Sequence, residues 1–457
     1  MSGLAAGIRL AQFDCPVTLL ERHSLWGGLN SFYKLRGRKY DVGLHALTNY
    51  VPRGTRGAPL TKALRQLRLR HADLELGQQS FSEIAFPDLR LRFSNDFEEL
   101  RAGVHAAFPS ERDAFDRLTE EVRAYDLETV PDALDSTRAR LERQLGDARL
   151  VDCLLLPLCY YGSAREDDLD WYQFCVLFQS IFLEGFARPR DGIRNLLKVL
   201  VERFKSLGGE LRMRTGVSRI LTEGGRTTGV ELDDGSVLPT ECVLSSAGYT
   251  ESMELCGRPV TRAEAGGRRL TFFESIFSLD RKPRDFGHEA TIVFFNTTDR
   301  FEYRSPADDI DARSGVIATP DNYANSPADG EGCMRVTALA SWDRWTAKAE
   351  DDYVAAKAAA NETLLSAVAP ISGDFRAHIL DTDSFTPRTI HHYTGHLGGS
   401  VYGCTEKRLD GRTPVDGLYV IGTDQGYLGV VGALVSGIGM ANQHVLAAGP
   451  LATGTQA

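Results

Sequence analysis

Apolar positions in the first thirty residues follow a helical spacing and then a strand spacing. Small and apolar residues over 2–11 predict a short helix, and the run Val17–Leu20 predicts a buried strand that ends at Glu21. Gly27 and Gly28 then open a loop. A helix, a strand and an acidic residue in this order are typical of the second half of a dinucleotide-binding βαβ unit, in which the acid binds a ribose hydroxyl.

The first half of such a unit is missing from this pattern. A full unit has a buried strand followed by Gly-x-Gly-x-x-Gly, and here only Gly3 can stand for the last glycine. Glu21 follows Gly3 by roughly 18 residues, near the roughly 20 expected between the glycine turn and the acid. An amphipathic helix followed by an unrelated strand is the alternative interpretation. We expect the natural chain to begin about 12–15 residues upstream, and a chain that begins at Met1 to bind its dinucleotide poorly.

The rest of the chain alternates between helical and strand patterns. Apolar residues at helical spacing predict helices over 60–69, 96–127, 188–210, 351–367 and 433–445. Alternating or continuous apolar runs predict a hairpin over 32–43 and strands over 81–93, 210–214, 217–221, 228–232, 242–247 and 418–421. The three segments between 210 and 232 are expected to form a meander. Strong alternation over 270–340 predicts a second sheet.

Residues 151–186 form the most apolar region. Pro157 and the polar residues 163–170 interrupt it, so it cannot be one membrane span. Three interpretations remain open: ordinary core helices, helices that line a greasy substrate tunnel, and a helix that lies in a membrane interface.

The order of these elements predicts an α/β protein with a discontinuous cofactor domain and an inserted substrate domain. The cofactor domain is expected to contain residues 1–75, 186–255 and 381–450. The substrate domain is expected to contain residues 76–185 and 256–380, and residues 451–457 to form a flexible tail.

Composition and charge narrow the function. The 457 residues are 42% hydrophobic and 25% charged, which is typical of a soluble globular protein, and the formal net charge of −10 argues against a nucleic-acid partner. The eight cysteines include no Cys-x-x-Cys pair, so we expect reduced thiols and no metal site. No charged leader with an apolar run opens the sequence, and no run of about 20 apolar residues occurs. We expect a cytoplasmic protein.

Motifs at both ends of the chain resemble one known family. They are similar to those of the phytoene desaturase, carotenoid isomerase and retinol saturase group, within the flavin amine oxidase superfamily. The motifs are Ser2-Gly3-Leu4-Ala5-Ala6, the strand end at Glu21, Gly27-Gly28, Tyr40-Asp41-Val42-Gly43, Thr386-Pro387-Arg388-Thr389, Gly399-Ser400-Val401-Tyr402-Gly403, Gly417–Asp424, Gly429 and Ser436-Gly437. The middle of the chain matches only loosely.

The resemblance implies an FAD-dependent oxidoreductase. Its fold would be a Rossmann-like FAD-binding domain, with the first strand missing, and an inserted α+β substrate domain that contains a mixed or antiparallel sheet. Its reaction would desaturate, isomerise or saturate a hydrophobic polyene or other isoprenoid by hydride transfer to or from the flavin. The resemblance also implies peripheral contact with a membrane, from which related desaturases take lipid-soluble substrates.

The resemblance carries over to particular residues. Backbone groups of the Gly27 loop would contact the pyrophosphate, and the Val217 backbone would contact the adenine. The family has a Gly-Asp step where this chain reads Gly422-Thr423-Asp424, so either Asp424 or Thr423 takes the role of the acid. The expected cofactor residues are Gly3, Glu21, Arg22, Gly27, Gly28, Asn30, Gly43, Val217, Gly422, Thr423, Asp424, Gly429 and Val430.

The substrate side offers fewer candidates. In the family, the segment after the Asp-x-Gly step runs beside the flavin ring, so His45 is the candidate catalytic residue. A histidine bound to a backbone partner is the alternative for the same residue. The expected tunnel residues are Tyr160, Tyr161, Phe174, Phe178 and Phe182.

Two other functions stay open. An amine oxidase-like enzyme for polar amines would have an aromatic cage near the flavin and usually a flavin-facing lysine. The C-terminal segment offers only Tyr419 and Tyr427 for such a cage. A non-catalytic protein that binds prenyl lipids is the other alternative, since the superfamily includes Rab dissociation inhibitors.

Overall fold

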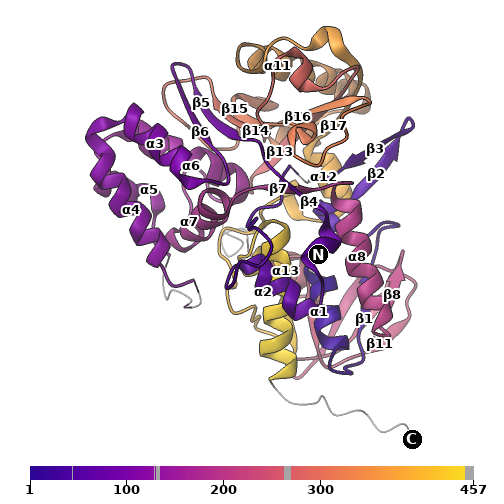
Figure 1. Ribbon diagram of the computed structural model, residues 1–457. Helices are drawn as coiled ribbons and strands as arrows, with labels where there is room; N and C mark the ends of the chain where they lie inside the picture. Colours follow the sequence, from indigo (N-terminus) through magenta and orange to yellow (C-terminus); the bar gives the residue numbers. More distant parts are fainter. Residues whose placement is uncertain (44, 128, 130–133, 262–268, 448–457) are drawn as a thin grey trace, which may run out of the picture.

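The computed structural model describes residues 1–43, 45–127, 129, 134–261 and 269–447; the expected tail over 451–457 lies outside these ranges. The chain forms three adjoining parts, which Figure 1 shows. One part contains the N-terminus and mixes helices with short strands, the second is a large sheet, and the third is a group of helices beside that sheet.

Two pairs of parallel strands form the centre of the first part. Strand β1 (Thr18–Glu21) pairs with β8 (Glu210–Met213), and β12 (Val243–Ser245) pairs with β18 (Leu418–Val420). Each pair is a separate two-stranded sheet. The parallel pairing of strands that are far apart in sequence is typical of a Rossmann-like domain.

Helix α1 (Ser2–Ala11) lies against both strand pairs. On one side, a Cβ added to Gly7 would lie 3.3 Å from Leu19 of β1. On the other side, Ala6 packs in one apolar cluster with Ile421, which follows β18. Helix α1 therefore joins the two strand pairs, and its small residues allow close packing on both sides.

Helix α13 (Gly429–Met440) packs against α1 at the level of the backbone. A Cβ added to Gly437 would lie 2.1 Å from the Ser2 carbonyl oxygen and 3.0 Å from the Ala6 nitrogen. Only glycine fits at this crossing. Helix α1, at the start of the chain, and helix α13, near its end, are thus in direct contact (Figure 1).

Further elements complete this part. They are the hairpin strands β2 (Phe32–Leu35) and β3 (Arg38–Asp41), helices α2 (Pro59–Leu67), α8 (Ile193–Ser206), α9 (Tyr249–Leu255) and α12 (Pro387–Thr394), and the meander β9 (Val217–Glu223), β10 (Arg226–Leu232) and β11 (Val237–Pro239). The expected hairpin is confirmed. The expected place of 210–214 in the meander is wrong, because β8 pairs with β1 and the third meander strand is β11.

Seven strands form the large sheet. They are β5 (Ser82–Phe86), β6 (Leu89–Phe93), β13 (Thr271–Leu279), β14 (Ile292–Asn296), β15 (Ile310–Ala318), β16 (Gly332–Ala340) and β17 (Ile379–Phe385). Their order is β17-β13-β16-β15-β14-β5-β6, and only the β14–β5 pair is parallel, so the sheet is mixed. Strand β17 spans the expected domain boundary at 381 and pairs with β13.

Both faces of the large sheet are buried. Phe273 and Val336 face a cluster that includes Leu364 of α11 (Glu350–Ser372) and Trp345 of α10 (Trp342–Thr346). Their neighbours, such as Phe272, pack in the cluster of the group of helices on the other side. This two-sided burial explains why the strands are apolar at nearly every position.

The group of helices comprises α3 (Phe97–Ala107), α4 (Arg112–Ala124), α5 (Thr137–Gln144), α6 (Ala148–Gly162) and α7 (Trp171–Phe178). The expectation of one helix over 96–127 is wrong, because α3 ends before Phe108, the residue that precedes Pro109. Pro157 does not divide the apolar region 151–186 as expected, since α6 continues through it and ends at Gly162. A π-helical turn over 179–184 follows α7.

Two short strands, β4 (Leu76–Gln78) and β7 (Ala187–Pro189), pair with each other between the first part and the sheet. The α/β fold, with a Rossmann-like cofactor domain and a substrate domain built on a mixed sheet, is confirmed. By length and composition, the helical stretch 429–446 could cross a membrane, but 56% of it is buried inside the protein, as in a core helix.

Candidate functional site

Helices α1 and α13 both begin without a capping side chain and without an acidic residue in the first turn. The first N–H groups of a helix have no partner within the helix and attract anions or carbonyl oxygens. The turn at Gly422 lies beside the start of α1, since a Cβ added to Gly422 would lie 3.0 Å from Ser2 Oγ. Gly3 lies in the same first turn of α1. The structure therefore brings predicted cofactor residues from both ends of the chain together.

The glycine loop packs tightly on itself and on the segment that follows β3. Gly27 has φ 120°, and a Cβ there would lie 2.9 Å from the Asn30 carbonyl oxygen. Gly28 has φ 58° and open space where its Cβ would be. A Cβ on Gly43 would lie 2.4 Å from the Leu29 carbonyl oxygen. Close backbone contacts exclude a side chain at Gly27 and Gly43, whereas the space beside Gly28 is open. We call these three glycines and Asn30 the glycine cradle.

The indole nitrogen of Trp26, which directly precedes this cradle, lacks a hydrogen-bond partner among the described residues. This Nε1 atom is buried. A bound group with oxygen acceptors would satisfy it.

The residues expected at the adenosine end also meet. The guanidinium of Arg22 donates to the Val217 carbonyl at 3.2 Å and lies 3.3 Å from Asp233 Oδ1. Glu21 accepts from the backbone N–H of His23 at 3.0 Å. Burial lowers the pKa of the Met1 amino group to about 6, and the Glu21 carboxylate acts in the opposite direction.

The carboxylate of Asp424 is hydrogen-bonded by groups of the protein itself. Its carboxylate accepts from the backbone N–H of Tyr249 at 2.7 Å and of Cys404 at 2.8 Å. Burial opposes its ionisation, but Lys407 and these two N–H groups hold the pKa of Asp424 below its usual value. Of the two alternatives at this turn, the geometry favours Thr423 as the polar group toward the cofactor, and that role stays a prediction.

A hydrogen-bonded chain leads away from the start of α13. Gly429, with φ 70°, lies beside Thr48 Oγ1, and Val430 next to it is buried. Thr48 donates to Asn49 Oδ1 at 3.1 Å, and Asn49 donates to Glu184 Oε2 at 2.8 Å. Asn49 has a positive φ of 61° and Glu184 ends the π-helical turn, two features that are frequent at functional sites.

Glu184 gives a pH-dependent prediction. Burial raises the pKa of Glu184 to about 7, from 4.5. The folded state then holds the proton more tightly than the unfolded state, so stability is lost as pH rises through 7. Glu184→Gln does not carry this proton, so its unfolding free energy should rise relative to that of wild type by about 2–3 kcal/mol from pH 4.5 to pH 8. Urea unfolding of both proteins at the two pH values measures this change. An equal difference between the two proteins at both pH values would contradict the assignment.

His45 is held by side chains rather than by a backbone partner. Its Nε2 lies 3.0 Å from Glu274 Oε1 and 3.3 Å from Thr337 Oγ1. Arg335 Nε donates to the same Glu274 oxygen at 2.5 Å. The side chains of His45, Glu274 and Arg335 are 15%, 9% and 2% exposed. We call these three residues and Thr337 the His45 cluster.

Glu274 and Arg335 were not among the residues expected from the sequence. Each is a lone charge in an apolar strand, Glu274 in β13 and Arg335 in β16. A buried charge needs an opposite partner, so two such residues of opposite sign in one predicted sheet were an available signal. Within this sheet, β13 and β16 are neighbours.

The expected tunnel residues separate into two groups. Phe174, Phe178 and Phe182 stack on one another with ring centroids 5.6 and 5.1 Å apart, and none is more than 1% exposed. They fill the core of the group of helices. Tyr160 donates to the Ser314 carbonyl at 2.9 Å, whereas the Tyr161 hydroxyl is buried without a partner among the described residues. Of the five expected tunnel residues, Tyr160 and Tyr161 are the remaining candidates, and the tunnel stays a prediction.

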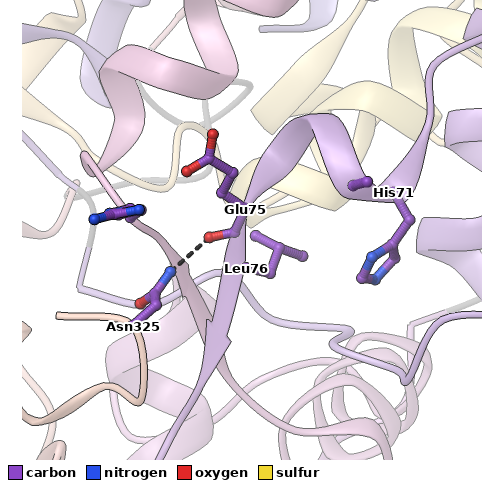
Figure 2. Close-up of a pocket in the computed structure, with 6 residues that line it drawn as sticks. His71, Glu75, Leu76 and Asn325 are labelled. Atoms are coloured by element: carbon purple, nitrogen blue, oxygen red, sulfur yellow. Dashed lines mark hydrogen bonds between the residues drawn. The ribbon is translucent and has the colours of Figure 1, made fainter.

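A separate surface pocket lies beside β4. Figure 2 shows His71, Glu75, Leu76 and Asn325 around it, with the Asn325 amide donating to the Glu75 carbonyl. Ala72 and Arg190 complete its lining. None of the predicted site residues lines this pocket.

Curated relatives match much of the chain. The all-trans-retinol 13,14-reductase of Danio rerio is 23% identical over 96% of this chain and 83% of its own length. A phytoene desaturase of Neurospora crassa is 26% identical over 54% of this chain, and the match spans 46% of that protein. The prolycopene isomerase of Arabidopsis thaliana is 19% identical over 54% of the chain and 46% of its own length.

Solved structures show the same fold. An oxidoreductase from Methanosarcina mazei has a TM-score of 0.68 at 17% identity, with 97% of this chain and 98% of that chain covered. A putrescine oxidase bound to putrescine has a TM-score of 0.61 at 16% identity, with 96% of each chain covered.

The residues at the two chain ends fit a flavin dinucleotide. The uncapped starts of α1 and α13, the glycine cradle and the unpartnered Trp26 Nε1 are suited to phosphate and carbonyl oxygens. The family model for flavin containing amine oxidoreductases matches residues 1–443. The cofactor is FAD, and the chain belongs to the flavin containing amine oxidoreductase family.

Proposed function

We propose that this enzyme oxidises, reduces or isomerises a hydrophobic polyene or isoprenoid with FAD. The observation that carries the proposal is the position of His45, which lies two residues after Gly43 of the glycine cradle and is held by Glu274. The names of the relatives, a retinol reductase, phytoene desaturases and a prolycopene isomerase, support the same substrate class.

The surroundings of the His45 cluster suit an apolar substrate. Tyr323 donates to the His45 carbonyl at 3.4 Å, and Tyr402 donates to the Tyr160 carbonyl. Tyr161, Tyr323 and Tyr402 pack in one apolar cluster. Aromatic rings exclude water and leave few charges for a polar substrate to meet.

FAD supplies the exchange of a hydride with a substrate carbon. The protein's own groups bind and orient. Backbone N–H groups of the glycine cradle and of the first turns of α1 and α13 would hold phosphate and carbonyl oxygens, and Glu21 would accept from a ribose hydroxyl. The buried rings around His45 keep water from the reacting carbon.

The proposed substrate class can be tested with defined probes. The FAD-loaded protein is mixed without oxygen with phytoene in detergent, and the dithionite-reduced protein with all-trans-retinol. We expect loss of the blue flavin absorbance in the first mixture or its return in the second, while putrescine changes neither. Reduction by putrescine, with no response to the two polyenes, would contradict the proposal.

The two tyrosines considered for an amine-binding cage have other partners. Tyr419 stacks on His444 with ring centroids 4.0 Å apart, and the Tyr427 hydroxyl lies 3.2 Å from that of Tyr172. Among the described residues, no ring contact joins Tyr419 and Tyr427, which favours the polyene proposal over a polar amine.

Glu21 gives a prediction for cofactor affinity. Glu21→Ala removes a charge-assisted hydrogen bond to the ribose, which is worth about 1.5–3 kcal/mol. We expect the dissociation constant for FAD to rise roughly 10- to 100-fold, measured by flavin fluorescence titration. Glu210→Ala is the control, because Glu210 lies on the neighbouring strand and binds Thr18 and Arg212. Equal affinity in the two variants would refute the role of Glu21.

A further inference from the structure

The two ring nitrogens of His45 have different surroundings. Nε2 faces the carboxylate of Glu274, which can only accept a hydrogen bond when ionised, so Nε2 carries a proton. Nδ1 has no hydrogen-bond partner within the part of the chain that the structure describes. The side chain keeps 15% of its surface exposed. Nδ1 is therefore the atom that can exchange a proton with a bound molecule.

Arg335 stabilises the ionised form of Glu274. Burial works to raise the pKa of Glu274, but Arg335 and His45 outweigh it and hold that pKa below its usual value. Arg335 also donates to the Val42 carbonyl, in the segment that leads to His45. Glu274 thus stays an acceptor fixed between a permanent cation and the imidazole.

Other charged and titratable groups face His45 from the neighbouring elements. Arg188 of β7 donates from Nη1 to the His45 carbonyl at 3.5 Å, and Arg188 is itself paired with Asp41 of β3. Tyr323 donates to the same carbonyl. These groups bind the His45 backbone, whereas Glu274 and Thr337 are the partners of its ring among the residues that the structure describes.

We propose that Glu274 positions His45 so that Nδ1 of His45 transfers the proton that accompanies hydride transfer, an inference that rests on the proposed function. In the saturating direction, one carbon of a C=C bond gains a hydride and its two electrons from reduced flavin, and its neighbour gains a proton from His45. Solvent then returns a proton to His45. In the desaturating direction, His45 takes the proton as the adjacent C–H gives its hydride to oxidised flavin. Glu274 stabilises the imidazolium in both directions.

The first test needs no substrate. The pH titration of His45 in the FAD-loaded protein is followed by ¹⁵N NMR of labelled histidine, with His45→Gln to assign the signal. In Glu274→Gln the midpoint should move to lower pH by about one unit or more, because the nearby negative charge is lost. Asp152→Asn is the matched control, since Asp152 is a fully buried carboxylate paired with Arg138 and Arg300. An unchanged midpoint in Glu274→Gln would overturn the positioning role.

The second test uses turnover of whichever polyene probe responds. We expect kcat to fall roughly 100-fold in His45→Gln and about 10-fold in Glu274→Gln, with partial recovery in Glu274→Asp. The limb of the kcat–pH profile should move with the NMR midpoint, and the solvent deuterium isotope effect should disappear in His45→Gln. A full isotope effect in His45→Gln would overturn the proton transfer. Absence of turnover in wild type would contradict the substrate class, while the NMR result still decides the role of Glu274.

Discussion

Replacing Gly437 by alanine should destabilise the cofactor domain by about 3 kcal/mol or more and abolish retention of FAD. The new Cβ would lie 2.1 Å from the Ser2 carbonyl oxygen. Each of these atoms is fixed to the backbone of its helix, so neither can move away unless the helix moves. Helices α1 and α13 would have to separate. Urea unfolding and the flavin content of the purified variant measure the two effects.

Gly439, in the same helix, provides the control. A Cβ added there meets nothing within 4 Å, so Gly439→Ala should be neutral or stabilise the helix by up to about 1 kcal/mol. If Gly437→Ala behaved like Gly439→Ala, the contact between the two chain ends would not exist as described.

Asp41→Asn should cost about 3–5 kcal/mol of unfolding free energy, because breaking a buried ion pair leaves an uncompensated charge. The Asp41 carboxylate pairs with Arg188 and lies 3.5 Å from Arg194, and it accepts from the N–H of Ile193 at the start of α8. Arg188 and Asp41 side chains are only 10% and 4% exposed. The variant should also bind FAD weakly, because Asp41 ties the strand before Gly43 to β7 and α8.

An exposed pair serves as the control for Asp41. Lys198 and Glu202 form an ion pair on the surface of α8, with side chains 71% and 65% exposed. Glu202→Gln should change the unfolding free energy by about 0.5 kcal/mol or less. Comparable losses in the two variants would mean that Asp41 does not anchor this region.

Local sequence patterns predicted the helices and strands better than they predicted which strands pair. The turn of the hairpin was predictable because Gly37 supplies a positive φ between two alternating strands. The pairing of β8 with β1 was not, because nothing local in 210–214 distinguishes a parallel strand from the first strand of a meander. Pro157 was misinterpreted because its neighbours in the apolar core override its local preference.

The cofactor side of the site was more predictable than the substrate side. Gly27, Gly43 and Glu21 belong to short motifs whose spacing follows from the shape of a dinucleotide. Glu274 and Arg335 come together only through the register of β13 and β16, with Cα partners Glu274–Thr337 and Ile276–Arg335. Sequence spacing contains no such register, so His45 was found without the groups that hold it.

Hydrogen exchange with and without FAD tests most directly whether the two ends of the chain bind one cofactor. We expect slower exchange at saturating FAD in two separate segments, 27–30 and 429–431, with one FAD bound per chain and no change in β14 and β15. Protection confined to one of these segments, or to the substrate domain, would contradict this expectation.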